Sequence, residues 1–204
     1  MKLHPVILQL LPEDVRLHGR TRLQAQSRRA REALVLSCKA SGVSLGPLEK
    51  GDRNAPLPFN GTFWSLSHKA RFVAAVVGPD PIGIDIEEIK PRTEGLLDYI
   101  ASAAEWALAD LSWETFFRFW TAKEAVLKTV GLGLAHLKKA RIHAILDLDN
   151  LIVDYASKLW AVRHFRFQDH IVSLTHSGHE IAWNLALEPH ALDNPVPAPP
   201  QPQA

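Results

Sequence analysis

The sequence contains a single cysteine, Cys38, among 204 residues. One thiol excludes both an intrachain disulfide and a cysteine-based zinc cluster. A lone cysteine fits a reducing compartment, and we expect a cytoplasmic protein. The apolar fraction of 47% and the charged fraction of 22% are ordinary for a globular protein. The chain can therefore bury a sizeable core without staples.

A strong net charge and a long apolar run are also missing. The formal net charge is +1, so no global electric field points to nucleic acid or to a membrane. No run approaches the roughly 18 apolar residues that are needed to span a bilayer. The apolar stretch from Val6 to Leu11 is too short for a signal peptide and is followed at once by acidic residues. We expect neither membrane insertion nor an obvious secretion route.

Turn residues and hydrophobic spacing divide the first half of the chain into a helix and three strands. Residues 13–40 are rich in arginine and predict a helix, whereas glycine and proline predict a loop in the following segment. Strand-like runs cover Phe63–Ser67 and Phe72–Val77. A third run covers Ile82–Ile86, where isoleucines alternate with other residues in the two-residue period of a strand.

The second half begins with helices and continues with strands. Residues 96–111 predict a helix, and Ser112 is the expected N-cap of another helix that ends at Gly131. Residues 140–187 predict mostly antiparallel strands. The tail from Pro189 is rich in proline and alanine, with little to bury, and we expect it to be disordered.

A short segment in the first half of the chain is similar in sequence to one in the second half. Residues 64–68 read Trp-Ser-Leu-Ser-His, and residues 172–176 read Val-Ser-Leu-Thr-His. So short a match arises easily by chance, and it has meaning only if the two halves also share a strand order.

Two carboxylates occur in the third strand, at Asp85 and Glu87. Residues separated by one position on a strand point to the same face. Hard oxygen ligands placed in this way suit magnesium, which takes one or two protein carboxylates together with water and phosphate oxygens. The simpler interpretation is a solvated strand face that carries two charges, and it is favoured for this segment alone.

The predicted helix after Ser112 carries Glu124 and Lys128, four residues apart on one face. An ordinary surface ion pair of this spacing contributes only a few tenths of a kcal/mol and is the default interpretation. The functional interpretation gives Glu124 a place in a metal site or the role of a base, and it lets Lys128 neutralise phosphate charge. The apolar neighbours Trp120 and Leu127 place this face beside the core.

Two further features could bind phosphate. Ser67 and His68 end a predicted strand just before Arg71, where a hydroxyl and an imidazole could hold a phosphate or a nucleotide edge. A loop histidine that is bonded to backbone is an equal alternative. The basic residues of the first predicted helix are either a solvated face or a site for phosphate or an acidic partner; with two later residues, they are Arg20, Arg22, Arg28, Arg29, Arg31, Lys50 and Arg53.

The order of these features resembles the 4′-phosphopantetheinyl transferase superfamily. A basic helix, Ser67-His68, the motif Gly-Ile-Asp-Ile-Glu at 83–87 and the motif Trp-Thr-Ala-Lys-Glu-Ala-Val-Leu-Lys at 120–128 follow one another over residues 13–134. The chain length resembles that of the two-halved, monomeric branch, which activates peptide and polyketide synthases.

The resemblance implies an α+β fold of two similar subdomains, each a mainly antiparallel sheet with a helix, related by a pseudo-twofold axis. The expected N-terminal subdomain covers residues 1–100, the C-terminal subdomain covers 101–188, and the proline-rich tail covers 189–204. The active site would lie in the cleft between the subdomains.

Members of this family move 4′-phosphopantetheine from coenzyme A to a serine of an acyl or peptidyl carrier protein, and they release adenosine 3′,5′-bisphosphate. The resemblance implies magnesium as the cation, with manganese as a substitute. It assigns the metal to Asp85, Glu87 and Glu124, the catalytic roles to Glu124 and Lys128, and coenzyme A contacts to Ser67, His68, Lys123, Lys128, Arg28, Arg31 and Arg53. Glu105 also matches a family glutamate, and its expected role is structural.

Two departures from the family pattern leave alternatives open. Residues 52–54 read Asp-Arg-Asn where the family commonly has Gly-Lys-Pro. Lys69-Ala70 follows Ser67-His68 where the family often has a small polar residue and then glycine or aspartate. An inactive coenzyme A-binding or scaffold protein with the same fold is the first alternative. A nucleic-acid binder that uses the arginine-rich helix is the second, and the near-zero net charge counts against it.

Overall fold

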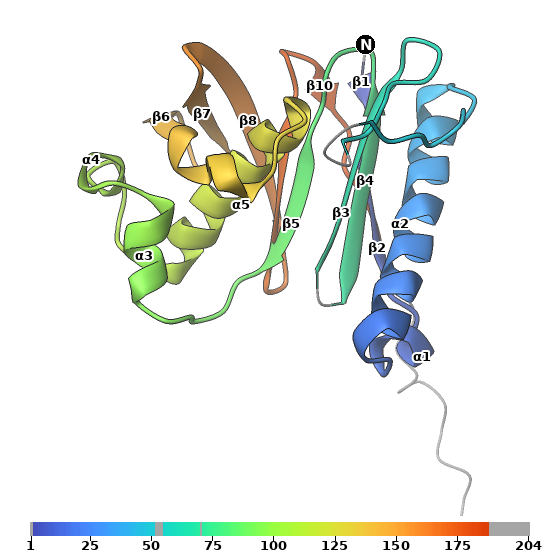
Figure 1. The fold of residues 1–204 in the computed structure, drawn as a ribbon, viewed down its shortest axis with the longest axis horizontal. Helices are drawn as coiled ribbons and strands as arrows, with labels where there is room; N and C mark the ends of the chain where they lie inside the picture. Colours follow the sequence, from blue (N-terminus) through green and yellow to red (C-terminus); the bar gives the residue numbers. More distant parts are fainter. Residues whose placement is uncertain (1, 52–54, 70, 188–204) are drawn as a thin grey trace, which may run out of the picture.

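Two β-sheets lie next to each other in the computed structural model, and helices cover their outer faces (Figure 1). The structure describes residues 2–51, 55–69 and 71–187. The secondary structure confirms the α+β class. No helix in the described part of the chain combines the length and the apolar character that a membrane span requires.

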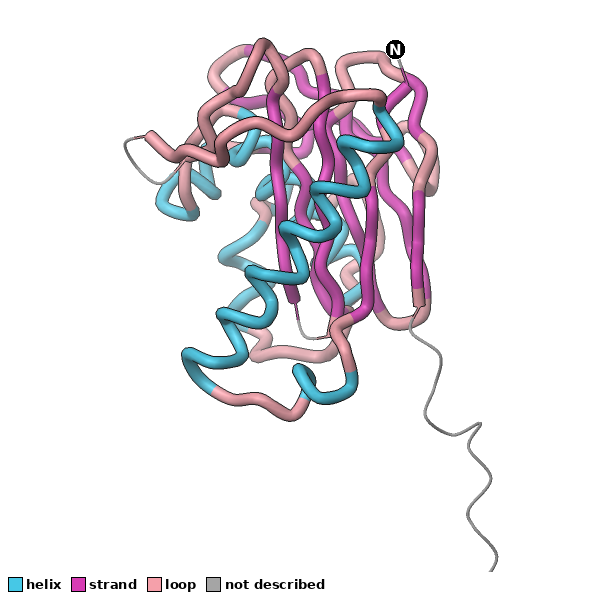
Figure 2. The backbone as a smooth tube through the Cα atoms, turned by 90° about the vertical axis from the view of Figure 1, so that its right-hand side faces the viewer, coloured by secondary structure: helices cyan, strands magenta, loops and turns pink. Residues whose placement is uncertain are grey.

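The first sheet has four strands in the order β11-β2-β4-β3. Its strands are β2 (Val6–Gln9), β3 (Phe63–Lys69), β4 (Phe72–Gly78) and β11 (Asn184–Ala186). All pairs are antiparallel except β11 with β2. The short helix α1 (Pro12–Val15) leads into α2 (Gly19–Ser41), which lies obliquely across this sheet (Figure 2).

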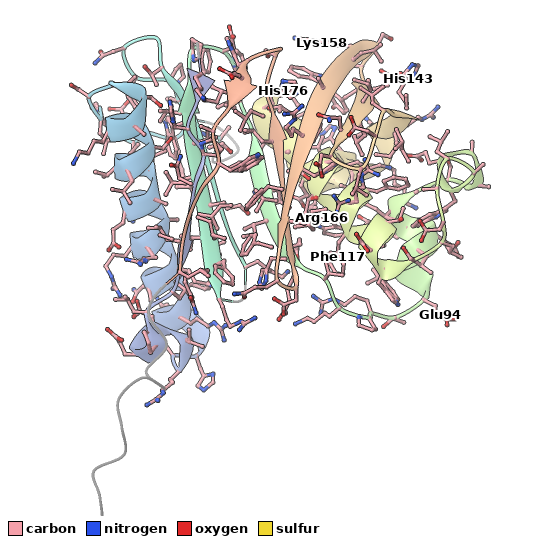
Figure 3. All side chains as sticks on the ribbon, turned by 180° about the vertical axis from the view of Figure 1, so that it is seen from behind. Glu94, Phe117, His143, Lys158, Arg166 and His176 are labelled. Carbon is pink, nitrogen blue, oxygen red and sulfur yellow. The ribbon has the colours of Figure 1, made fainter. Side chains whose placement is uncertain are left out.

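The second sheet has five antiparallel strands in the order β5-β9-β8-β7-β6. They are β5 (Ile84–Glu88), β6 (Arg141–Ile145), β7 (Asn150–Tyr155), β8 (Lys158–Phe167) and β9 (His170–Thr175). The helices on this side are α3 (Gly95–Ile100), α4 (Ala103–Trp106), α5 (Trp113–Thr129) and the 3-10 helix η2 (Leu134–Lys139). His143 and Lys158 mark the end of the sheet that is remote from α2 (Figure 3). A parallel pair of two-residue strands, β1 (Lys2–Leu3) and β10 (Glu180–Ile181), completes the described strands.

The strand order β2-β4-β3 of the first sheet is repeated as β5-β9-β8 in the second. In each case a helix, α2 or α5, follows the first strand and precedes the other two. In this repeat, β3 is equivalent to β8, and β4 is equivalent to β9. The similar segments 64–68 and 172–176 lie on β3 and at β9. These two strands are not equivalent in the repeat, so the sequence similarity does not reflect it.

Strand pairing crosses the expected subdomain boundary at residue 100 in both directions. Strand β5 precedes that boundary but is paired with β9 in the second sheet, and β11 follows it but is paired with β2 in the first. The two sheets are thus built by exchange of strands rather than by two separate stretches of chain. The expected tail, residues 189–204, lies outside the described residues.

Three apolar layers hold these elements together. Every side chain of β4 is buried, and alternate residues face opposite ways. Val73, Ala75 and Val77 pack towards α2, whereas Phe72, Ala74 and Val76 pack between the two sheets. A third cluster joins α5 to the second sheet. The central position of β4 explains why its sequence is continuously apolar rather than alternating.

The prediction of one continuous helix over residues 96–111 is wrong, because the structure divides this segment. Ala101 is extended, and a new short helix, α4, begins at its N-cap Ser102. The Ser102 hydroxyl accepts from the Glu105 amide while the Glu105 carboxylate accepts from the Ser102 amide, which is a capping box. The prediction for α5 is confirmed: Ser112 caps its start, and Gly131 adopts a left-handed φ of 68° just after its end.

Candidate active site

The candidate site lies where edge strand β3 of the first sheet meets edge strand β5 of the second (Figure 1). Side chains from alternate residues of β3 bond to β5, in place of a backbone ladder. The Ser65 Oγ accepts from the Ile84 amide at 3.1 Å, the Ser67 Oγ donates to Asp85 Oδ1 at 2.8 Å, and the Lys69 Nζ donates to Glu87 Oε1 at 2.9 Å. The two-residue period of both strands brings these partners into register.

Helix α5 brings Glu124 and Lys128 to the same edge. Lys128 Nζ donates to Asp85 Oδ1 at 2.7 Å and to the Ile84 carbonyl at 3.0 Å. Close approach of the helix depends on Gly83, because a Cβ at this position would lie 1.9 Å from the Ala125 carbonyl oxygen. The bare backbone of Gly83 therefore lets α5 pack directly on the start of β5.

Three carboxyl groups, Asp85, Glu87 and Glu124, influence one another in this site. Burial, together with the charges of Asp85 and Glu87, raises the pKa of Glu124 to about 7, although Lys128 and Lys69 oppose the shift. Burial also raises the pKa of Glu87, although its hydrogen bond from Lys69 opposes the shift. A carboxyl group with a pKa near 7 can exchange a proton at neutral pH.

The site supplies oxygen donors of the type that a divalent cation takes, although its side chains are not gathered around a metal position. Carboxylate oxygens are the ligands that magnesium prefers. Oδ2 of Asp85 is buried and has no hydrogen-bond partner among the described residues, and Glu124 makes no hydrogen bond with any of them. In the present arrangement Lys128 and Lys69 hold Asp85 and Glu87. In the described part of the chain, no group of three or more histidine, cysteine or acidic side chains is arranged to bind a metal ion.

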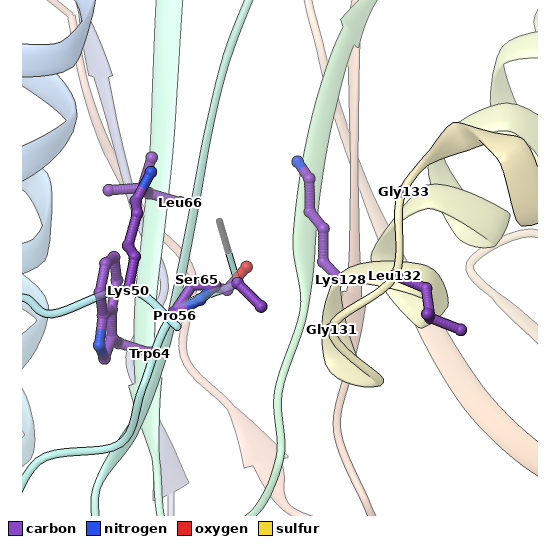
Figure 4. A pocket seen from close by; sticks show the side chains of 10 residues that line it. Lys50, Pro56, Trp64, Ser65, Leu66, Lys128, Gly131, Leu132 and Gly133 are labelled. Carbon is purple, nitrogen blue, oxygen red and sulfur yellow. The ribbon is translucent and has the colours of Figure 1, made fainter. Parts of the chain in front are cut away.

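A pocket of about 430 Å³ opens over these groups. Its lining includes Ser67, His68, Lys69, Asp85, Glu87, Trp120, Glu124, Lys128 and Leu134. A second pocket of about 180 Å³ shares Leu66 and Lys128 with it. Figure 4 shows Lys50 and Trp64 facing Lys128 and the glycine-containing loop 131–133 across this second pocket. The two pockets carry the positive charges of Lys50, Lys69 and Lys128.

His68 lies in the same site with a lowered pKa. Burial is the main cause, and the positive charge of Lys128 adds to it. The imidazole is consequently neutral at pH 7, and it can offer both a donor and an acceptor to a ligand.

The structure brings together six of the residues predicted from sequence: Ser67, His68, Asp85, Glu87, Glu124 and Lys128. Lys123 points elsewhere, since it is buried, lies 2.7 Å from Glu105 Oε1 and donates to the Ile100 carbonyl. This pairing agrees with the structural role expected of Glu105.

Two of the predicted arginines, Arg28 and Arg31, do not line the two pockets. Arg28 on α2 donates to both carboxylate oxygens of Asp14, at 3.0 and 2.9 Å. Arg31 is exposed on the same helix. Neither is among the described residues that line the two pockets. Arg53 lies outside the described residues.

Sequence reasoning missed the pocket role of two lysines. The sequence shows Lys50 only as one of several basic residues, and it shows Lys69 only as a departure from the family pattern. Lys69 follows Ser67 by two residues, so the strand period places both side chains on the face towards β5. That spacing was the available signal. Lys50 had none, because a loop position does not show which way its side chain points.

The fold and the site define an α+β protein with an acidic, lysine-containing pocket at the junction of two sheets. Residues 81–183, half of the chain, match the family model described as the 4′-phosphopantetheinyl transferase superfamily. The chain belongs to this superfamily. The matched part contains β5 and α5, which carry Asp85, Glu87, Glu124 and Lys128.

Curated relatives include transferases of this kind from bacteria. A 4′-phosphopantetheinyl transferase of Bacillus subtilis is 33% identical over 101 residues, which cover 47% of this chain and 44% of that protein. The 4′-phosphopantetheinyl transferase HetI of Nostoc sp. is 34% identical over 100 residues, covering 45% and 41%. The 4′-phosphopantetheinyl transferase Sfp of Bacillus subtilis strain 168 is 34% identical over 77 residues, covering 35% and 34%. The chain thus matches less than half the length of each of these relatives.

Proposed function

We propose that this protein transfers 4′-phosphopantetheine from coenzyme A to a serine of an acyl or peptidyl carrier protein, with release of adenosine 3′,5′-bisphosphate. The observation that carries the proposal is the convergence of Asp85, Glu87, Glu124 and Lys128 in one pocket beside Ser67 and His68. Membership of the superfamily and the names of the relatives support the same reaction.

Coenzyme A would lie across the two neighbouring pockets, which share Leu66 and Lys128. The neutral His68 would donate to a phosphate group, and Lys50 would supply a positive charge in the adjoining pocket. Ser67 remains a predicted phosphate contact, and its hydroxyl would have to turn from Asp85 to donate to a phosphate. Arg28, Arg31 and Arg53 remain predicted phosphate contacts. Lys123 is the weakest of the predicted contacts, because Glu105 already neutralises it.

The transfer forms a bond from the carrier serine oxygen to the phosphorus that bears pantetheine, and it breaks the pyrophosphate bond to the nucleotide. Lys128 would offset the negative charge that develops on the bridging oxygen. Glu124, or a water that it holds, would accept the serine proton. Asp85, Glu87 and Glu124 would hold magnesium or manganese, which supplies positive charge to the phosphate oxygens when bound.

The setting of the reaction forms part of the same proposal. A monomer in the cytoplasm would act on carrier proteins whose recognition helix is acidic. The exposed arginines of α2, among them Arg31, offer a positively charged surface for such a partner.

The intact mass of an apo carrier protein tests the reaction directly. Incubation with this protein, coenzyme A and magnesium is expected to add one phosphopantetheine, about 340 Da. Glu124→Ala and Lys128→Ala should abolish the gain, whereas Lys139→Ala, at an exposed position, should retain it. No mass gain on several unrelated carrier proteins, together with no binding of coenzyme A, would reject the proposed function.

A further inference from the structure

A chain of buried hydrogen bonds joins helix α5 to the second sheet. His164 Nδ1 on β8 lies 2.8 Å from Ser173 Oγ on β9, and Ser173 Oγ lies 2.6 Å from Thr121 Oγ1 on α5. Thr121 Oγ1 in turn donates to the Phe117 carbonyl at 2.8 Å. The side chains of His164, Ser173 and Thr121 are all buried, so these bonds are made in surroundings of low dielectric constant.

The buried imidazole fixes the order of donors and acceptors along this chain. Nε2 of His164 is buried and has no partner among the described residues, so a proton on it would have no acceptor. The proton is therefore assigned to Nδ1, which donates to Ser173, and Ser173 then donates to Thr121. Burial holds the pKa of His164 well below its ordinary value, and the charges of Arg118 and Arg166 add to this effect. His164 is thus a neutral donor that orients the Ser173 hydroxyl towards α5.

A second hydroxyl pair joins the last turn of α5 to the same strand. Thr129 Oγ1 lies 2.8 Å from Thr175 Oγ1, which also accepts from the Gly83 amide at 2.9 Å. Hydrogen-bonded hydroxyl groups approach this closely, whereas a methyl carbon and an oxygen stay about 3.3 Å or more apart. The two pairs therefore hold α5 closer to β9 than apolar side chains at positions 121 and 129 could.

The two pairs lie on either side of the active-site groups of α5. Glu124 follows the first pair by one turn of helix, and Lys128 directly precedes Thr129. Ser173 is paired with Asp85 across β9 and β5. The first pair is thus in register with the carboxylate that Lys128 holds.

We infer that the two hydroxyl pairs between α5 and β9 position the active site, because they fix how closely the helix approaches the strand. Thr121 and Thr129 are positioning residues in this sense, since they act through Glu124 and Lys128. Methyl groups in place of both hydroxyl groups would lift α5 and move its charged groups away from Asp85. The inference rests on the proposed function, because that reaction gives Glu124 and Lys128 their roles.

Two double variants separate this role from ordinary packing. Thr121→Val/Thr129→Val keeps the shape of both side chains and removes both hydroxyl groups, whereas Thr121→Ser/Thr129→Ser keeps the hydroxyl groups and loses two methyl groups. In phosphopantetheine transfer, the valine variant should show a kcat at least about tenfold below wild type, with a KM for coenzyme A within about twofold. The serine variant should keep its kcat within about twofold, although the lost methyl groups lower its midpoint of thermal unfolding.

Crystal structures of the two double variants give a readout that needs no turnover. The distance from Lys128 Nζ to Asp85 Oδ1 should exceed about 3.5 Å in the valine variant. It should stay near the present 2.7 Å in the serine variant.

A second variant and a matched control use buried serines. Ser173→Ala releases α5 from β9 without adding volume, and its kcat should fall by at least about threefold. Ser37 is also buried, donates to the His4 carbonyl and accepts from the Val77 amide, but it lies on α2 against the first sheet. Ser37→Ala should lower the midpoint of thermal unfolding and leave kcat within about twofold of wild type.

The outcomes separate the inference from the proposed function. A full kcat or an unchanged distance from Lys128 to Asp85 in the valine variant overturns the inference and leaves the transfer reaction intact. A loss of kcat in the serine variant or in Ser37→Ala also overturns it, because activity would then follow stability alone. If the valine variant does not fold, the same two measurements on Ser173→Ala decide. If wild type neither transfers phosphopantetheine nor binds coenzyme A, the proposed function fails, and the crystal structures still decide whether the hydroxyl pairs position α5.

Discussion

Lys128 Nζ lies 2.7 Å from Asp85 Oδ1, and this ion pair joins the last turn of α5 to the second residue of β5. The Asp85 side chain is 7% exposed and that of Lys128 is 27% exposed. Two residues that are 43 positions apart in sequence are held together at the junction of the two sheets. The pair fixes the lysine over the pocket, where a phosphate group could reach it.

Glu124 should make stability depend on pH. Burial and the neighbouring carboxylates raise its pKa from 4.5 to about 7, so the folded protein keeps a proton that the unfolded chain releases. Between pH 4.5 and about 7, the folded state binds more protons than the unfolded state does. The free energy of unfolding therefore falls as pH rises through this range. In EDTA, the free energy of unfolding of wild type should fall by about 1 kcal/mol more than that of Glu124→Gln between pH 5 and pH 8. Solvent screening of this partly exposed group keeps the effect small. Urea unfolding at several pH values measures the difference, and a constant difference would contradict the prediction.

Gly83→Ala should destabilise the protein by about 2–4 kcal/mol. The added Cβ would meet the Ala125 carbonyl oxygen at 1.9 Å and the Thr129 Oγ1 at 2.6 Å, so α5 would have to move away from β5. Gly95→Ala is the matched control, since a Cβ there meets nothing within 4 Å and alanine favours the helix. Chemical denaturation of both variants compares them. Equal stability of the two variants would show that α5 tolerates displacement.

Lys123→Met should reduce stability rather than coenzyme A affinity. Removal of the Lys123 ammonium leaves the buried carboxylate of Glu105 without its cation. The free energy of unfolding should fall by about 3 kcal/mol as a result. The double variant Lys123→Met/Glu105→Gln should recover part of this, because the uncompensated charge is removed as well. Calorimetric titration of coenzyme A into the folded variants should give dissociation constants within about twofold of wild type. A large loss of affinity with unchanged stability would instead support Lys123 as a phosphate contact.

Ser65→Ala should cost about 1–2 kcal/mol of unfolding free energy. The Ser65 hydroxyl is the acceptor for the Ile84 amide at the buried junction of β3 and β5, and alanine leaves that donor unpaired. Ser44→Ala, at an exposed loop position, is expected to change stability by less than about 0.5 kcal/mol. Hydrogen exchange at the Ile84 amide provides a local readout. Unaltered protection of that amide in Ser65→Ala would show that the hydroxyl is dispensable.

Local patterns in the sequence determined several parts of this protein. The period of a strand placed Asp85 and Glu87 on one face, and the period of a helix did the same for Glu124 and Lys128. Ser112 and Gly131 predicted the limits of α5 because capping depends on a few adjacent residues. The order of the motifs indicated the superfamily, which the family match confirms.

Only the tertiary structure decided which of these faces meet. Lys123 and Glu124 are adjacent in sequence, yet successive residues diverge by about 100° around a helix, and only packing shows which direction leads to the pocket and which to Glu105. The pairing of β5 with β9, and the β3 ladder that holds Lys69 on Glu87, join segments whose separation along the chain no local pattern records. Such contacts are selected by the burial of whole sheet faces, and this is a property of the assembled fold rather than of any single segment.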